Sequence, residues 1–241
     1  MTAAVPCSWR LSTCHRLRPS MPKPFAWSYS ALSAFETCPR QYHEMRVLKR
    51  WPDPPGEAQQ FGKLCHTYLE NRINAGIELP VFLRHVEPVV ARLESSPGAL
   101  QAEYKYALDA QLQPVEFFAP TAWVRAVGDV VKIHEDRGFA MDWKSGKYRE
   151  GDDQLRLQSN VMFGTYPHLQ RISVMYVWLK DKRATTRVFD RADVPATWQA
   201  FLPRVQRMEH AAKTGDYPPK PSGLCRKYCR VKTCEFNGSQ S

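Results

Sequence analysis

The sequence predicts an α/β fold in which a central mixed β-sheet is flanked by helices. Two observations support this prediction. Apolar residues recur with a helical period in the first hundred residues and with a period near 2 from Leu100 onward. The expected elements then follow in the order helix, strand, strand, strand, helix, strand, which describes a mixed sheet with helical layers. With 241 residues, the chain is long enough to bury a core of its own.

Helices are expected over most of the first hundred residues. Ser28 can cap a helical segment at 28–45, which Cys38-Pro39 divides into two short helices. A second segment, 57–74, ends near Gly76 and carries one apolar stripe. The stripe contains Phe61, Leu64, Cys65, Tyr68, Leu69 and Ile73. A further helix is expected over 80–94.

Strands are expected at 100–108, 122–133 and 139–144, where β-forming residues are frequent. We expect these three strands to be antiparallel, with the last two joined through 134–138. A helix over 152–166, an apolar strand over 171–179 and a strand over 185–190 follow. Asp193 is the expected cap of a final helix, and a Pro- and Lys-rich tail begins after Gly215.

The chain is basic, because 34 Lys and Arg residues outnumber 24 Asp and Glu residues and give a net charge of +10. This charge favours a polyanionic partner such as nucleic acid, although a basic soluble protein is the alternative. No apolar run is long enough to cross a membrane. The first 25 residues contain no acidic residue and no segment of signal-peptide character.

We therefore expect a cytoplasmic protein of a bacterial or phage-infected cell. Residues 1–26 are expected to be an N-terminal extension, with Met21 as an alternative start of translation. Residues 27–241 are expected to form one domain, which includes a cysteine-rich segment at 216–241.

Two carboxylates and a lysine are the candidates for catalytic chemistry. Val127 and Val131 share a strand face with Asp129, so this carboxylate lies in an apolar row and requires a cation beside it. On the next strand, Asp142 and Lys144 are two residues apart and point to the same side. A divalent ion between Asp129 and Asp142, with Lys144 at its flank, would satisfy all three charges.

Such a site suits the hydrolysis of phosphodiesters. Oxygen ligands hold Mg²⁺ or Mn²⁺, which neutralises phosphate charge and lowers the pKa of a bound water. Lys144 can orient that water or stabilise the developing charge. The alternative is that the two aspartates are strand-end carboxylates paired with Lys144 or Arg125. Either aspartate alone fits that alternative, whereas the two together favour the metal site.

Four further polar residues are candidates near this site. His66 follows Gly62 by one helical turn, and a helix with Gly62 at its contact point could bring the imidazole to the metal. A structural role for His66 is the alternative. Glu103, on the first strand, is another candidate ligand. Gln154 and Gln158 share one helix face and could contact the DNA backbone or Lys144, with solvation as the alternative.

Seven cysteines in a chain without a secretion signal indicate reduced thiols or metal ligands. Cys225, Cys229 and Cys234 lie within ten residues, but three thiolates need a fourth donor. Their spacing does not distinguish an iron–sulfur cluster from Zn²⁺. A frayed tail with incidental cysteines is the alternative. Cys65 lies on the apolar stripe and is expected to pack in the core.

Several motifs share the order and rough spacing of motifs in a known family. They are Gly62-x3-His66, Gly128-Asp129, Asp142-Trp143-Lys144-Ser145-Gly146 and Gln154, preceded by Ser28-Tyr29-Ser30-x-Leu32 and Cys38-Pro39. From about Ser28 to Cys234, the chain resembles the RecB-like branch of the PD-(D/E)XK nucleases, which includes phage and CRISPR-associated members. One departure is Gln158, because the helix motif of the branch usually reads Gln-x3-Tyr.

The resemblance implies a restriction-endonuclease-like fold and a set of site residues. His66, Asp129, Asp142 and the Trp143 carbonyl would bind Mg²⁺ or Mn²⁺, Lys144 would be the catalytic lysine, and Gln154 would be the helix-motif glutamine. Several members of the branch hold a [4Fe–4S] cluster with one cysteine before the core and three after it. Cys38 together with Cys225, Cys229 and Cys234 matches this arrangement, and the cluster would join the two ends of the domain. The spacing of the last three cysteines differs from the spacing that is common in the branch.

The resemblance also implies a function. We expect an exonuclease acting on DNA ends or single strands in recombination, repair or phage replication, with endonuclease activity left open. One alternative is a non-catalytic nucleic-acid-binding protein with a structural Zn²⁺ or iron–sulfur site. Another is a nuclease subunit that acts only with a helicase or a single-strand-annealing protein.

Overall fold

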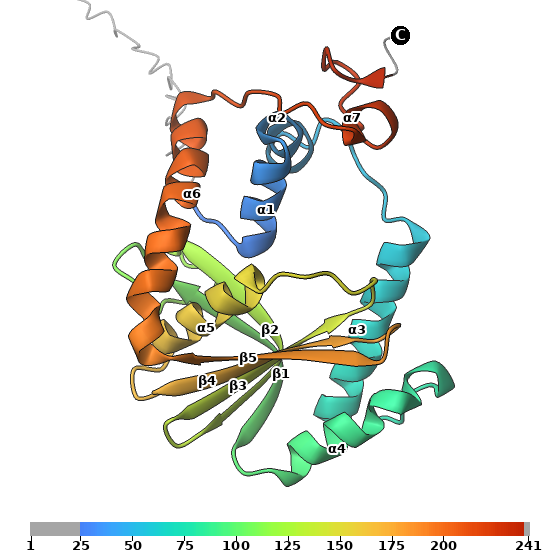
Figure 1. The fold of residues 1–241 in the computed structure, drawn as a ribbon, viewed down its shortest axis with the longest axis vertical. Coiled ribbons are helices and arrows are strands. Elements are labelled where there is room, and N and C mark those ends of the chain that lie inside the picture. The colour runs from blue at the N-terminus through green and yellow to red at the C-terminus, as the bar shows by residue number, and fades with distance from the viewer. Residues whose placement is uncertain (1–24, 239–241) are drawn as a thin grey trace, which may run out of the picture.

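A five-stranded mixed sheet forms the centre of the computed structural model, which describes residues 25–238 (Figure 1). The strands lie in sequence order, with three antiparallel pairs and one parallel pair between the third and fourth strands. They are β1 (Ala99–Leu108), β2 (Val124–His134), β3 (Arg137–Lys144), β4 (Arg171–Trp178) and β5 (Arg183–Asp190). The predicted mixed sheet is therefore confirmed.

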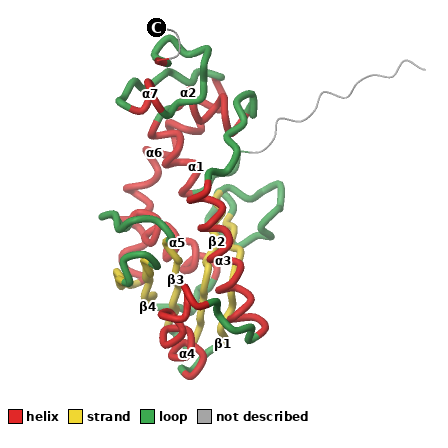
Figure 2. The backbone as a smooth tube through the Cα atoms, turned by 90° about the vertical axis from the view of Figure 1, so that its right-hand side faces the viewer, coloured by secondary structure: helices red, strands yellow, loops and turns green. Residues whose placement is uncertain are grey.

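Helices cover both faces of the sheet, as Figures 1 and 2 show. One layer contains α1 (Tyr29–Thr37), α5 (Asp153–Thr165) and α6 (Val194–Thr214), the last preceded by the short 3₁₀ turn η3 (Arg191–Asp193). The other layer contains α3 (Glu57–Ala75), the 3₁₀ turn η2 (Val81–Val86) and α4 (Glu87–Ser95). Away from the sheet lie α2 (Pro39–Tyr42), the π-helical turn η1 (His43–Val47) and α7 (Leu224–Lys227).

The predicted helix boundaries near the N-terminus are confirmed by local geometry. The Ser28 hydroxyl accepts a hydrogen bond from the Ala31 amide and caps α1. Cys38 is extended, and Pro39 occupies the first turn of α2, so the chain breaks where the sequence indicated. Helix α3 ends at Gly76, which adopts the left-handed conformation that favours glycine.

Three details of the helix predictions were wrong. Phe61 and Leu64 belong to the predicted apolar stripe of α3, but they are 39% and 44% exposed, because the sheet contacts a narrower face with Cys65 and Leu69. The helix expected over 80–94 begins as the 3₁₀ turn η2. Asp193 is the N-cap residue of α6, as expected, but its side chain bonds no amide of α6 and accepts a hydrogen bond from the Asp190 amide instead.

Successive side chains of β3 point alternately into two hydrophobic cores, and this alternation determines on which face of the sheet the candidate site lies. Ala140 packs into the core between the sheet and α1, α5 and α6. Met141 and Trp143 pack into the opposite core, between the sheet and α3 and α4. Because successive side chains of a strand point to opposite faces, Asp142 lies on the α5 side. The structure thus confirms that Met141 and Trp143 point away from Asp142.

The segment after α6 returns to α2, where segments near the two ends of the chain are hydrogen-bonded (Figure 1). The Arg40 amide donates to the Pro218 carbonyl, and Lys220 Nζ donates to the Glu36 carbonyl at 2.6 Å. Of the predicted N-terminal extension, residues 1–24 fall outside the described part of the chain. None of the helices within residues 25–238 has the length and apolar character needed to cross a membrane.

Candidate active site

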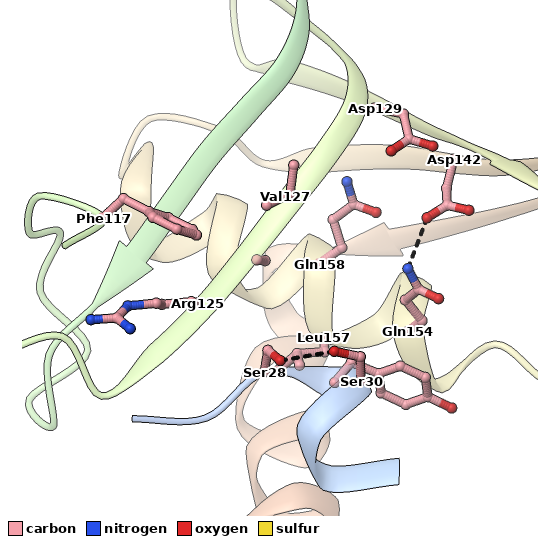
Figure 3. Close-up of a pocket in the computed structure, with 12 residues that line it drawn as sticks. Ser28, Ser30, Phe117, Arg125, Val127, Asp129, Asp142, Gln154, Leu157 and Gln158 are labelled. Carbon is pink, nitrogen blue, oxygen red and sulfur yellow. Dashed lines mark hydrogen bonds between the residues drawn. The ribbon is translucent and has the colours of Figure 1, made fainter. Parts of the chain in front are cut away.

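The two candidate aspartates lie next to each other on neighbouring strands. Val130 of β2 pairs with Met141 of β3, so Asp129 and Asp142 follow in the same antiparallel register. Both line one cavity on the α5 side of the sheet (Figure 3). The Trp143 amide donates to Asp129 Oδ2 at 2.7 Å. This hydrogen bond holds the carboxylate at the point where the pairing of β2 with β3 ends. The predicted convergence of Asp129 and Asp142 is therefore present.

Asp142, Lys144 and Gln154 form a closed triangle of contacts. Lys144 Nζ lies 2.6 Å from Asp142 Oδ2 and donates to Gln154 Oε1 at 2.9 Å. Gln154 Nε2 donates to Asp142 Oδ1 at 2.8 Å (Figure 3). Of the three interpretations of Gln154, namely contact with the DNA backbone, contact with Lys144 and solvation, the geometry favours contact with Lys144. Both polar ends of the glutamine side chain are used, so its amide holds the acid and the lysine in fixed positions.

Asp142 is strongly perturbed by its surroundings. The residue is only 5% exposed. Burial raises the pKa of its carboxyl to about 6, and the negative charge of Asp129 adds to this effect against the opposing charge of Lys144. A buried carboxylate beside a second carboxylate fits a bound cation, which would offset both charges.

His66, Glu103 and Asp129 come together from α3, β1 and β2. One ligand atom from each lies within 4.8 Å of the others, and this is the one such group among residues 25–238. His66 Nδ1 is 3.4 Å from Asp129 Oδ2 and 3.9 Å from Glu103 Oε1. Asp142 lies outside this set, so Asp129 is grouped with His66 and Glu103, whereas the sequence predicted an ion between Asp129 and Asp142.

The backbone at Glu103 departs from regular strand geometry. Glu103 has a φ of 50° in the middle of β1, a left-handed conformation that is unfavourable for a residue with a side chain. Ala102 and Tyr104 on either side keep their pairing with β2. Burial raises the pKa of the Glu103 carboxyl, and the Asp129 charge adds to the shift. Strain of this kind is found mainly at functional sites.

The position of His66 depends on Gly62. A Cβ at Gly62 would lie 2.7 Å from Ser145 Oγ, so α3 approaches the end of β3 as closely as the sequence predicted. His66 Nε2 lies 3.0 Å from the Trp143 carbonyl, to which it can donate. Burial lowers the pKa of His66, but the hydrogen bond with Asp129 and the nearby carboxylates outweigh it and raise the pKa.

Gln158 occupies the floor of the same cavity. It is 3% exposed, yet neither its amide nitrogen nor its carbonyl oxygen has a hydrogen-bond partner in the described structure. Gly128 lies beneath it, and a Cβ there would be 2.7 Å from Gln158 Nε2. The amide is aimed into the cavity (Figure 3), where a ligand could satisfy it.

Tyr176 is a site residue that was not predicted from the sequence. It lies on β4 opposite Asp142, and Lys144 Nζ is 4.8 Å from the centroid of its ring. The ring limits the positions open to the ammonium group and attracts it. Only the register of the parallel pair β3–β4 identifies this neighbour, and no sequence pattern fixes that register.

Four of the cysteines line a second, small cavity between α2 and the C-terminal segment. They are Cys38, Cys225, Cys229 and Cys234. The Lys220 amide donates to Cys38 Sγ at 3.4 Å, and the Ser222 amide donates to Cys225 Sγ at 3.3 Å. Within residues 25–238, no three of the sulfur atoms lie within 4.8 Å of one another. Cys65 is fully buried in the core, as predicted.

A model of one protein family matches residues 26–234, which is most of the chain, and its description is PD-(D/E)XK nuclease superfamily. The chain belongs to the PD-(D/E)XK nuclease superfamily. Membership implies hydrolysis of phosphodiester bonds in a nucleic-acid substrate. Six of the residues that carry the PD-(D/E)XK resemblance line the cavity on the α5 side, namely Ser28, Tyr29, Ser30, Asp129, Asp142 and Gln154.

Solved structures support the fold of this PD-(D/E)XK chain. It is similar to a crystal structure described as "Putative exonuclease" from Eubacterium rectale, with a TM-score of 0.53 and 14% sequence identity over 94% of this chain and 95% of that chain. Similarity to SSO0001, with a TM-score of 0.45 and 11% identity over 87% and 85% of the chains, is too distant to support an inference. At these identities, the first likeness concerns the fold alone. No curated protein matches the sequence.

Proposed function

We propose that this chain is a Mg²⁺- or Mn²⁺-dependent deoxyribonuclease of the RecB-like branch, and that it acts as an exonuclease in DNA recombination, repair or phage DNA metabolism. The observation that supports this most directly is the meeting of His66, Glu103 and Asp129 beside the Asp142–Lys144–Gln154 triangle. The net charge of +10 suits a DNA substrate.

The residues that would hold the ion are His66, Glu103, Asp129 and Asp142, with the Trp143 carbonyl. When bound, Mg²⁺ or Mn²⁺ neutralises phosphate charge and lowers the pKa of an attacking water. His66 Nδ1 faces the carboxylates while Nε2 faces the Trp143 carbonyl, an arrangement that fixes the orientation of a metal-binding histidine. The two ring nitrogens of an imidazole point in nearly opposite directions, so an ion bound at Nδ1 lies several ångströms from a carbonyl that accepts from Nε2. Binding of the same ion by the Trp143 carbonyl, which the resemblance implies, therefore requires the imidazole to turn away from that carbonyl.

Lys144 is the proposed catalytic lysine. Asp142, Gln154 and the Tyr176 ring hold its ammonium group on the cavity side of β3. From there it can donate a hydrogen bond to the attacking water or to the charge that develops on the phosphate. Gln154 is a positioning residue, since it contacts Asp142 and Lys144 at once.

Digestion of end-labelled linear DNA with Mg²⁺ or Mn²⁺, and with EDTA as the control, tests the proposal. We expect cleavage only with metal, release of products from the ends and resistance of a closed circle. Lys144→Ala and Asp129→Asn should lose at least 100-fold in rate and retain DNA binding. Cleavage of the closed circle would indicate an endonuclease.

Absence of cleavage with every metal, together with retained DNA binding, would favour a non-catalytic binding protein instead. Weak cleavage that rises strongly on addition of a helicase or a single-strand-annealing protein would identify a nuclease subunit with a protein partner.

We further propose that Cys38, Cys225, Cys229 and Cys234 hold a [4Fe–4S] cluster. Their shared cavity and the two amide hydrogen bonds to sulfur support this, because such bonds stabilise thiolate ligands. One cysteine before the core and three after it match the iron–sulfur members of the branch that the chain resembles, and this placement favours the cluster over a single Zn²⁺.

Purification without oxygen tests the choice of metal. A brown protein with broad visible absorption and bound iron is expected. A colourless protein that contains zinc would contradict the iron–sulfur proposal and leave the nuclease proposal untouched.

A further inference from the structure

The β1–β2 connection, residues 109–123, places two adjacent phenylalanines beside the active-site cavity. Phe118 is 77% exposed. Phe117 lines the cavity that also contains Asp129 and Asp142 (Figure 3). The two rings are 5.0 Å apart and perpendicular. A single exposed phenylalanine is common on protein surfaces and does not by itself indicate a function. The residues around this pair must therefore show whether it binds a ligand.

Two cations accompany the phenylalanine pair. Lys105 Nζ is 5.9 Å from the centroid of each ring, and the Arg125 guanidinium is 5.7 Å from that of Phe117. Neither cation forms an ion pair with a carboxylate of residues 25–238. Exposed aromatic faces with positive charges that have no carboxylate partner match a nucleotide, whose base can stack while its phosphate is attracted.

The connection is anchored to the sheet. The Val115 amide donates to the Ala107 carbonyl, and the Trp123 amide donates to the Leu108 carbonyl, at 3.0 and 2.8 Å. Asp109 Oδ1 accepts two further amide hydrogen bonds from within the turn. A segment tied at both ends loses little conformational freedom when a ligand binds, so the aromatic pair is suited to stacking.

The phenylalanine pair also lies at a distance from the catalytic carboxylates that a bound nucleic-acid strand can span. Arg125, Val127 and Asp129 alternate along β2 and all line the cavity (Figure 3). Two steps of two residues along a strand span about 13 Å. Nucleotides next to the scissile phosphate can therefore reach Arg125 and the phenylalanines while that phosphate lies at Asp129.

We propose that Phe117 and Phe118, together with Lys105 and Arg125, form a base-stacking subsite for unpaired nucleotides next to the scissile phosphate. The substrate class is single-stranded DNA or a frayed DNA end, because paired bases keep their faces inside the duplex stack. This inference rests on the proposed nuclease function, whose substrate it specifies.

The test compares a normal single strand with a strand of the same length whose bases near the cleaved end are replaced by abasic sites. Phe118→Ala and Phe117→Ala should lower kcat/KM for the normal strand by roughly 5- to 160-fold, since stacking contributes about 1–3 kcal/mol per base. On the abasic strand the variants should match the unaltered protein. Phe118→Trp should retain cleavage of the normal strand, and Phe82→Ala, a change at an exposed phenylalanine on η2, is the matched control.

A binding measurement in EDTA keeps the two proposals separate. A single strand carrying 2-aminopurine near its end should lose fluorescence on binding to the unaltered protein and to Phe82→Ala, but not to Phe118→Ala. Equal losses on normal and abasic strands, or no loss in either phenylalanine variant, would overturn the stacking subsite while the nuclease function stands. If the unaltered protein cleaves no DNA but the fluorescence changes as expected, the nuclease proposal fails and the stacking surface remains.

Discussion

Asp142 shows how a single buried residue couples protonation to metal binding. Its carboxyl is surrounded by protein, and burial together with the Asp129 charge raises its pKa to about 6. Ionised Asp142 therefore weakens the metal-free fold at neutral pH. A cation in the site would remove this cost, so metal binding should displace a proton from the site below about pH 6.

We predict that Asp142→Asn flattens the pH dependence of stability in EDTA. The raised pKa means that the stabilising contribution of neutral Asp142 is complete below about pH 4 and is lost as the pH rises through 6. The asparagine side chain stays neutral, so the melting temperature of the variant should fall less between pH 5 and pH 8 than that of the unaltered protein. At about 1.4 kcal/mol per pKa unit, the whole effect is roughly 3 kcal/mol, and about half of it, roughly 1.4 kcal/mol, falls between pH 5 and pH 8, because Asp142 of the unfolded chain already ionises near pH 4.

Melting curves in EDTA at pH 5 and pH 8 measure this effect. Added Mg²⁺ should stabilise the unaltered protein more at pH 8 than at pH 5 and the variant little at either pH. Identical pH profiles for the two proteins would contradict the role assigned to burial of Asp142. The raised pKa of His66 acts in the same direction, and the comparison removes the part of it that Asp129 and Glu103 cause. The part that the Asp142 charge causes is lost together with that charge in the variant.

At the scale of elements, the site depends on how closely α3 approaches the end of β3. Gly62 is the contact point, and His66 lies one turn further along the helix. The neighbouring atom is the hydroxyl of Ser145, which can rotate away from a small side chain. A large side chain would move the helix and the imidazole with it.

We predict a graded response to substitution of Gly62. Gly62→Ala should be nearly neutral, whereas Gly62→Leu should weaken Mn²⁺ binding and slow cleavage by at least 10-fold, because small displacements of catalytic groups are costly. Calorimetric titration with Mn²⁺ and the cleavage rate measure the two effects. Gly56→Ala, at an open position before α3, is the control. Full activity of Gly62→Leu would show that the approach of α3 does not position His66.

At the scale of the molecule, the cavity lined by the four cysteines lies between α2 and the segment after α6. Hydrogen bonds from Arg40 and Lys220 already connect these segments. A bound cluster would add covalent links across this junction, and its binding free energy would contribute to folding.

We predict that Cys229→Ser loses the visible absorption of the cluster and melts at a temperature at least 5 °C lower. Its C-terminal segment should also become sensitive to protease beyond Gly215. Cys65→Ser, at a buried cysteine that does not line the cavity, should keep the absorption even if it melts earlier. A variant at Cys229 with unchanged absorption would exclude this residue as a ligand.

The sequence was sufficient for the order of the elements and for the convergence of Asp129 and Asp142. Both follow from local patterns, because side-chain alternation along two adjacent strands determines which carboxylates share a face. Other features depend on contacts between distant segments. The left-handed backbone of Glu103, the position of Tyr176 beside Lys144 and the exposure of Phe61 are set by sheet register and helix packing, which single-residue preferences do not determine.

The hydrogen bonds between Arg40 and Pro218 and between Glu36 and Lys220 also bear on biosynthesis. Roughly 180 residues separate the partners, so at 5–20 residues per second a ribosome needs roughly 10–40 s between them. During that interval, α1 and α2 on either side of Cys38 lack the C-terminal segment that covers them in the folded protein. Nascent chains that terminate before residue 218 never acquire it, and quality-control proteases would be expected to recognise them by this uncovered surface.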